Sequence, residues 1–111
     1  MDEKPLIWLG STLGTVRRFP ASARRQVGYE LYLVQQGLEP SDWKTLPLVG
    51  SGVREIRIHV GAEYRVLYIA KFAAAVYVLH AFAKQTRKTR QADIELARKR
   101  WGEVVRLRHL K

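Results

Sequence analysis

The 111-residue sequence contains no cysteine, which excludes disulfide bonds and thiolate metal sites. Its three histidines are too scattered to match a metal-binding pattern such as HExxH, so we expect neither a metal nor another cofactor. No apolar run approaches the ~20 residues that a membrane-spanning helix needs. The acidic N-terminus has too short an apolar part for a secretory signal. A length of 111 residues predicts one domain, residues 1–111, and these absences predict that it is soluble and cytoplasmic and has no membrane partner.

Acidic residues are scarce, and the excess of positive charge is unevenly distributed. The chain has 20 lysine and arginine residues against 10 aspartate and glutamate residues, a net charge of +10. Residues 84–111 alone carry +7, from ten basic and three acidic side chains. A field of this sign raises the local concentration of polyanions such as RNA, DNA or an acidic protein, but the same charge also serves solubility.

The centre of the chain has the pattern of three antiparallel strands. Residues 53–60 alternate between apolar and charged positions, which is typical of a half-buried strand. Residues 61–63 form a connector of hairpin length. The segments 64–70 and 75–82 are rich in aromatic and β-branched residues, with a turn at 72–74 between them. The third strand is the most apolar, which indicates a central position with both faces covered.

A strand and two helices are predicted before these strands. Residues 4–9 are expected to join the sheet, and a helical hairpin of residues 13–19 and 21–36 follows. The second helix carries an apolar stripe of Ala23, Val27, Leu31 and Val34. Its Gly28 costs about 1 kcal/mol relative to alanine, which close packing against a neighbour would explain. A solvated outer face is expected for the four arginines of the hairpin, Arg17, Arg18, Arg24 and Arg25.

Residues 38–52 are expected to form a loop, because they are rich in proline, glycine and serine. Residues 91–107 have the spacing of an amphipathic helix, with Arg98, Lys99 and Arg100 on or beside its polar side. The order of elements predicts an α+β fold in which an N-terminal strand and a helical hairpin pack on an antiparallel sheet, followed by a C-terminal helix. We expect the helices on one face, which leaves the other face free to form a cleft.

Basic side chains interrupt the three central strands. Arg57 and Arg65 lie within the first and second strands, and Lys84 directly follows the third, so the three converge if the strands are neighbours. A guanidinium group presents a planar fork to phosphate, and lysine presents a point charge. The competing interpretation is that Arg57 pairs with Glu55 or Glu63 on the sheet surface and has no further role.

The histidines within the strands have different expected roles. Alternation places His59 on the same face as Glu55 and Arg57, where its imidazole, which titrates near neutral pH, could reach a cleft. His80 lies in the apolar third strand and is expected to be a hydrogen-bonded core residue.

Four segments occur in one order: REIRI at 54–58, EYRVLYIA at 63–70, VYVLHAFAKQTRKT at 76–89 and IELARKR at 94–100. In this order they resemble the HigB-like branch of the RelE/ParE toxin superfamily, which includes phage-derived HigB-like proteins. The resemblance covers nearly the whole chain and implies a RelE-like fold. It also implies the toxin of a type II toxin–antitoxin pair, commonly a metal-independent endoribonuclease that cuts mRNA on the ribosome and so inhibits translation.

Carried over residue by residue, the resemblance implies a catalytic set of Arg57, Arg65, Lys84 and Glu55. Arg65 would stabilise charge at the phosphorane, Arg57 would bind the adjacent phosphate, and Lys84 would assist or act as general acid. Glu55 is the only carboxylate embedded in the motif and is the candidate base. The expected RNA-binding residues are His59, Arg87, Lys88 and Arg90.

The implied partners are mRNA, the ribosome and a cognate antitoxin, either acidic or a HigA-like helix-turn-helix protein that covers the basic cleft. Two positions depart from the branch: Gln85 stands where a second lysine is usual, and Arg90 stands where proline is usual. Three alternatives stay open. They are a ParE-like toxin that inhibits DNA gyrase without nuclease activity, a degenerate non-toxic homologue that acts as a binding module, and a generic RNA-binding domain.

Overall fold

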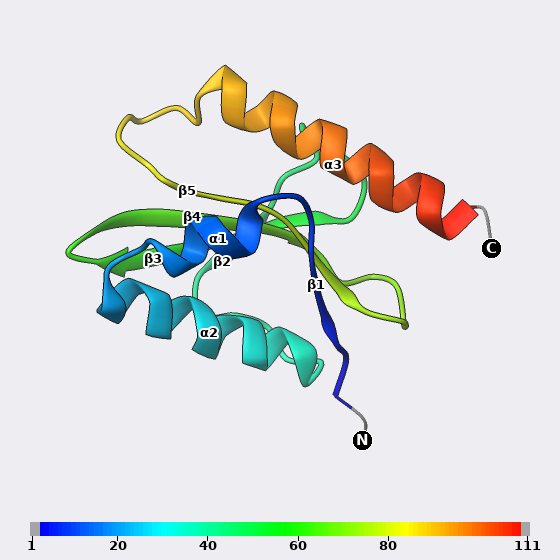
Figure 1. The fold of residues 1–111 in the computed structure, drawn as a ribbon, viewed down its shortest axis with the longest axis horizontal. Helices are drawn as coiled ribbons and strands as arrows, with labels where there is room; N and C mark the ends of the chain where they lie inside the picture. Colours follow the sequence, from blue (N-terminus) through cyan, green and yellow to red (C-terminus); the bar gives the residue numbers. More distant parts are fainter. Residues whose placement is uncertain (1–2, 110–111) are drawn as a thin grey trace.

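A computed structural model describes residues 3–109. A five-stranded sheet in the order β1-β5-β4-β3-β2 forms the middle layer, and helices lie on either side of it (Figure 1). The elements in chain order are β1 (Leu6–Trp8), α1 (Thr12–Arg17), α2 (Ala21–Gln35), β2 (Trp43–Thr45), β3 (Val53–Val60), β4 (Ala62–Ile69), β5 (Val76–Ala83) and α3 (Gln91–His109). The predicted α+β class is confirmed.

The predicted meander of three strands is also confirmed, because β3, β4 and β5 pair antiparallel in sequence order. β5 lies between β1 and β4, and all its residues except the last are buried, as its apolar sequence predicted. One boundary differs. Glu63 was placed in the connector, but β4 begins at Ala62, and Glu63 pairs with His59 inside the ladder.

Two predictions about the sheet were wrong. β1 pairs parallel with β5, so the sheet is mixed rather than wholly antiparallel. The expected loop 38–52 contains β2, which pairs antiparallel with the first half of β3. A strand of three residues is too short to show an alternating pattern. β2 is a strand because it pairs with β3, and its own three residues do not predict this.

The prediction that the helices share one face of the sheet was wrong as well. α2 lies on one face, where Val16 of α1 shares its core, and α3 lies across the other face (Figure 1). Each face therefore has its own apolar core. The predicted stripe of α2, from Ala23 to Val34, is buried in the first, and Ile94, Ala97 and Val104 of α3 are buried in the second. α3 packs chiefly along β5, so part of its face of the sheet stays open around β3.

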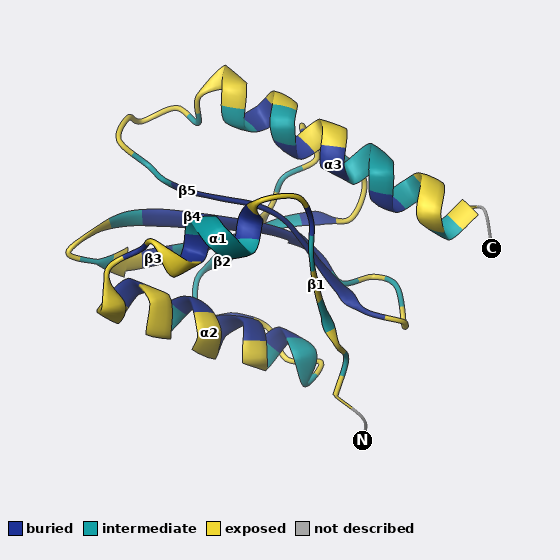
Figure 2. Ribbon diagram, viewed as in Figure 1, coloured by how far each residue is buried: buried dark blue, intermediate teal, exposed yellow. Residues whose placement is uncertain are grey.

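The outer surfaces of the helices are largely as predicted (Figure 2). The four arginines of the hairpin are exposed, as are Arg98 and Lys99 of α3. Arg100 is the exception, because it is only 7% exposed and so does not belong to the polar side. Within residues 3–109, no helix is both long and apolar enough to cross a bilayer.

Gly28 gives a first testable prediction. It is exposed in the middle of α2, and a Cβ atom added there would meet nothing within 4 Å, so the expected close packing is wrong. Gly28→Ala should therefore stabilise the protein by about 1 kcal/mol, because alanine loses less backbone entropy in a helix. Thermal denaturation followed by circular dichroism should show Tm raised by roughly 4–8 °C. An unchanged or lower Tm would contradict this.

Candidate functional site

Two arginines face each other across the β3–β4 hairpin. Arg57 pairs directly with Arg65 in the antiparallel register. The backbone N–H of Lys84, at the end of β5, donates to the carbonyl oxygen of Glu63 at 2.8 Å, which holds Lys84 beside β4. Like charges directly opposite each other destabilise a sheet. The arrangement therefore favours an anion near the two guanidinium groups.

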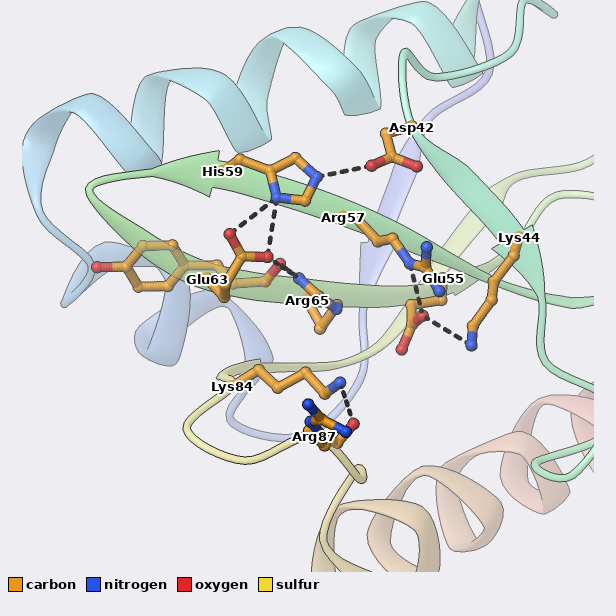
Figure 3. Close-up of polar contacts among 10 residues, drawn as sticks. Asp42, Lys44, Glu55, Arg57, His59, Glu63, Arg65, Lys84 and Arg87 are labelled. Atoms are coloured by element: carbon orange, nitrogen blue, oxygen red, sulfur yellow. Dashed lines mark hydrogen bonds and ion pairs between the residues drawn. The ribbon is translucent and has the colours of Figure 1, made fainter.

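Each of these arginines has its own carboxylate (Figure 3). Arg57 Nε lies 3.5 Å from Glu55 Oε1, the ion pair that the competing interpretation predicted. Arg65 Nη1 donates to Glu63 Oε1 and to the carbonyl oxygen of Tyr64, both at 3.0 Å. Arg65 is buried, whereas the side chain of Arg57 is 34% exposed. Arg65 is thus fixed in place, and Arg57 is more accessible to a ligand.

A cavity of about 450 Å³ opens between β2, β3, the segment after β5 and the start of α3. Its charged lining consists of one carboxylate and four basic side chains: Glu55, Lys44, Lys84, Arg87 and Lys88. Four of these five, all but Lys44, were predicted site residues. Leu46, Leu48, Thr89, Gln91 and Ile94 complete the wall. Such a lining suits a polyanion with phosphate groups.

Lys44 was missed by the sequence analysis. It lies in β2, opposite Glu55 in the register, and its Nζ is 3.9 Å from Glu55 Oε1. The side chain of Lys44 is 50% exposed, whereas that of Glu55 is 3% exposed. No sequence signal could have found Lys44, because the pairing of β2 with β3 brings it to the cavity.

The remaining predicted residues lie outside this cavity lining. Arg57 and Arg65 are next to it on the sheet. Arg90 is 61% exposed and forms a weak ion pair with Asp93 at 3.8 Å. Gln85 is exposed beside Lys84 and does not line the cavity. The resemblance predicts a lysine at position 85. Because this position does not line the cavity, glutamine there removes no group from the cavity lining.

His59 lies on the predicted face but is bound by two carboxylates (Figure 3). Its Nε2 is 2.6 Å from Asp42 Oδ2, and its Nδ1 is 2.8 Å from both oxygens of Glu63. The hydrogen bonds to Asp42 and then to Glu63 raise the pKa of His59. Glu63 has a lowered pKa, because His59 and Arg65 donate to it. Neither Asp42 nor Glu63 was predicted to contact His59, since each was assigned to a connecting segment.

The His59 cluster predicts a pH-dependent contribution to stability. A raised folded pKa means that the contribution of His59 is fully present below its unfolded pKa of about 6.5 and is lost as pH rises through the higher folded value. For Glu63, the contribution is lost as pH falls below about 4.5. The Tm difference between the wild type and His59→Gln should therefore be largest near pH 5.5 and shrink toward pH 9. A difference that grows with pH would contradict this.

His80 is a hydrogen-bonded core residue, as predicted. Its Nε2 lies 2.7 Å from Asp93 Oδ1, and Arg100 Nη1 is 3.4 Å from its Nδ1. Because arginine only donates, Nδ1 accepts and Nε2 carries the proton. Burial lowers the pKa of Arg100. This network ties the first turn of α3 to β5, and so positions the segment with Lys84, Arg87 and Lys88.

Residues 15–102 match the family model of the phage-derived protein Gp49-like (DUF891). This chain belongs to the Gp49-like family. That family consists of RelE/HigB-like toxin-type proteins, and the α+β architecture is compatible with a RelE-like fold. No curated protein matches the chain. The Gp49-like match spans α2, β2, β3, β4, β5 and most of α3, and so includes the whole lining of the basic cavity.

Proposed function

We propose that this Gp49-like protein is the toxin of a type II toxin–antitoxin pair, from the HigB-like branch, and that it cuts mRNA on the ribosome. The observation that carries the proposal is the cavity whose charged lining consists of four basic side chains and the carboxylate of Glu55, with Arg57 and Arg65 opposite each other on the adjoining strands. The family supports the same direction, because its members are RelE/HigB-like toxin-type proteins.

The proposed reaction needs a base, an acid and stabilisation of the phosphorane. The RNA 2′-hydroxyl loses its proton to the base and attacks the adjacent phosphorus. The bond from phosphorus to the 5′-oxygen breaks, and that oxygen takes a proton from the acid. The products are a 2′,3′-cyclic phosphate and a 5′-hydroxyl. No other reactant is required.

The side chains can be assigned to these roles. Glu55 is the base, because it is the only carboxylate that lines the cavity. Arg65 stabilises the phosphorane, since a guanidinium stays protonated and offers a planar fork. Arg57 binds the adjacent phosphate, and Lys84 is the general acid. Lys44 joins the set as a further phosphate contact, on the strength of its position opposite Glu55.

Glu63 has a separate place in this proposal. Its carboxylate, 44% exposed, already holds His59 and Arg65. An incoming phosphate would compete with Glu63 for the exposed His59, so His59 exchanges Glu63 for the RNA backbone, whereas the buried Arg65 keeps its contacts with Glu63 and the Tyr64 carbonyl oxygen. His59 then contributes charge to RNA binding after it is released.

Two alternatives are less well supported. A toxin that only binds gyrase has no need for a basic cavity that also has a carboxylate in its lining. Gln85 would suggest a degenerate homologue, but its side chain does not line the cavity. The cavity retains three lysines in its lining, Lys44, Lys84 and Lys88. We further propose that the cognate antitoxin is a HigA-like helix-turn-helix protein that acts in the cytoplasm and covers this basic surface.

Primer extension on a reporter mRNA tests the proposal, in a reconstituted translation system with and without ribosomes. Discrete cuts that appear only on translated message are the expected result. Intact message together with normal translation would overturn it, and gyrase supercoiling would then be measured. Cuts on free RNA would retain the nuclease and remove the ribosome from the proposal.

A further inference from the structure

A second cavity, of about 420 Å³, lies at the C-terminal end of α3. It is formed between that helix and the turn that joins β4 to β5. Its lining is Lys71, Phe72, Trp101, Val105, Arg108 and His109. None of these residues belongs to the proposed cleavage machinery, and none is acidic.

Cations and aromatic rings alternate in this second cavity. Lys71 Nζ lies 5.4 Å and Arg108 Cζ lies 5.5 Å from the ring centroid of Phe72. Arg108 Nη1 also donates to the hydroxyl of Tyr77 at 3.4 Å. Among residues 3–109, neither cation forms an ion pair with a carboxylate. The two cations contact only the ring of Phe72 and the hydroxyl groups of Ser51 and Tyr77 among the contacts described. Because none of these groups is negatively charged, the positive charges of Lys71 and Arg108 are not neutralised.

Trp101 supplies the second aromatic surface. Its Nε1 donates to the carbonyl oxygen of Ser51 at 3.1 Å, which fixes the indole between α3 and the β2–β3 connection. Proteins that bind single-stranded nucleic acids combine an exposed aromatic ring with nearby cations, as the fixed, partly exposed indole of Trp101 is combined here with Lys71 and Arg108. Bases stack on the ring, and the backbone phosphates contact the cations.

One face of α3 connects this second cavity with the basic cavity near Glu55. Its residues are spaced four, three, four and three apart: Ile94, Arg98, Trp101, Val105 and Arg108. Ile94 lines the first cavity, and the last three line the second. Arg98 lies between them, exposed, and donates from Nε to the carbonyl oxygen of Leu48 at 2.8 Å. The distance from Ile94 to Arg108 along the helix is about 21 Å.

We propose that the second cavity is an accessory binding site for single-stranded RNA. Lys71 and Arg108 contact the backbone phosphates, and a base stacks on Trp101. The same strand continues along α3 past Arg98 toward the basic cavity. The choice of RNA as ligand rests on the proposed function, because charge and aromatic rings alone select a single-stranded nucleic acid. The site itself is separate from the cleavage residues.

Fluorescence anisotropy tests this with the full chain and a labelled single-stranded 2′-O-methyl oligoribonucleotide, which cannot be cleaved through its 2′ position. The double variant K71Q/R108Q should bind more weakly, and the slope of log K against log salt should fall by about 1.4, since two phosphate contacts are lost. The matched control is K99Q/R106Q, which removes two exposed charges of α3 and should retain the wild-type slope.

Trp101 is tested by a pair of variants. Trp101→Leu should weaken binding by about 5- to 150-fold, which corresponds to one stacked base. Trp101→Phe keeps an aromatic face and should recover most of the affinity. Thermal denaturation identifies any variant that has lost its fold, and the Phe variant keeps the test informative if Leu is unstable.

Two results would overturn the inference. In the first, K71Q/R108Q and Trp101→Leu bind the oligoribonucleotide like the control. In the second, polyglutamate competes equally well and Trp101→Leu has no effect, which would indicate a contact for acidic protein. The proposed cleavage is judged separately by primer extension. Binding that depends on this cavity but occurs without cleavage would retain the inference and reject the nuclease.

Discussion

Arg65→Gln should lower the rate of mRNA cleavage by about 100- to 1,000-fold, as loss of one transition-state donor typically does. Arg65 is buried, directly opposite Arg57, and is fixed by its contacts with Glu63 and the carbonyl oxygen of Tyr64. Its charge is therefore already in place before the substrate binds. Glutamine keeps the approximate length of the side chain but supplies no charge to the phosphorane.

The measurement is the single-turnover rate of cleavage at one mapped site on translated message. Arg25→Gln is the matched control, because it removes an equally large charge from the exposed face of α2, on the other side of the sheet. Arg65→Lys separates charge from shape: it keeps the charge but lacks the planar fork, so only partial activity is expected. A fold check by circular dichroism accompanies each variant.

Lys84→Gln should reduce the same rate, and the double variant with Arg65→Gln should show no cleavage above background. Full activity in the double variant would remove both residues from the mechanism. Equal losses in Arg65→Gln and Arg25→Gln would show that net charge alone matters, and would leave no specific role for the β3–β4 arginine pair.

Arg100→Met should destabilise the protein by about 2–4 kcal/mol, because it leaves buried acceptors without a donor. Nη1 of Arg100 donates to Thr12 Oγ1 at 3.0 Å and to the carbonyl oxygen of Leu79 at 2.9 Å, and lies near His80 Nδ1. Methionine fills much of the volume but supplies no hydrogen bond. The loss should appear in urea denaturation as a lower midpoint with an unchanged slope.

Arg106→Met is the matched control for this second prediction. It removes the same charge from the same helix at an exposed position, and a change within about 0.5 kcal/mol is expected. Equal stability of Arg100→Met and the wild type would contradict the prediction. It would mean that the cost of burying the guanidinium cancels its hydrogen bonds.

Gly10 is consistent with this role for Arg100. It has φ of +55°, and a Cβ added to it would lie 2.7 Å from Arg100 Nη2. The guanidinium thus occupies the space that any other side chain at position 10 would need. Gly10 and Arg100 are 90 positions apart in the sequence but pack against each other. Neither segment has a sequence pattern that predicts this contact.

Local pattern determined much of this protein. The alternation of residues 53–60 placed Glu55, Arg57 and His59 on one face, and the stripe of α2 was buried as its spacing predicted. The hairpin connection made β3 and β4 neighbours, and so brought Arg57 and Arg65 together. These features depend on contacts between residues that are close in sequence, which periodicity and turn chemistry describe well.

Only the tertiary structure decided what completes the site. β2 brings Lys44 to Glu55, and Asp42 reaches His59 from the same segment. α3 lies on the face that was expected to be empty, which buries Arg100 and creates both cavities. Short strands and lone charged residues carry no periodic signal. Their positions depend on strand pairing and packing between segments that are distant in the sequence. A charged side chain such as Arg100 can be buried only because those distant segments supply its hydrogen-bond partners.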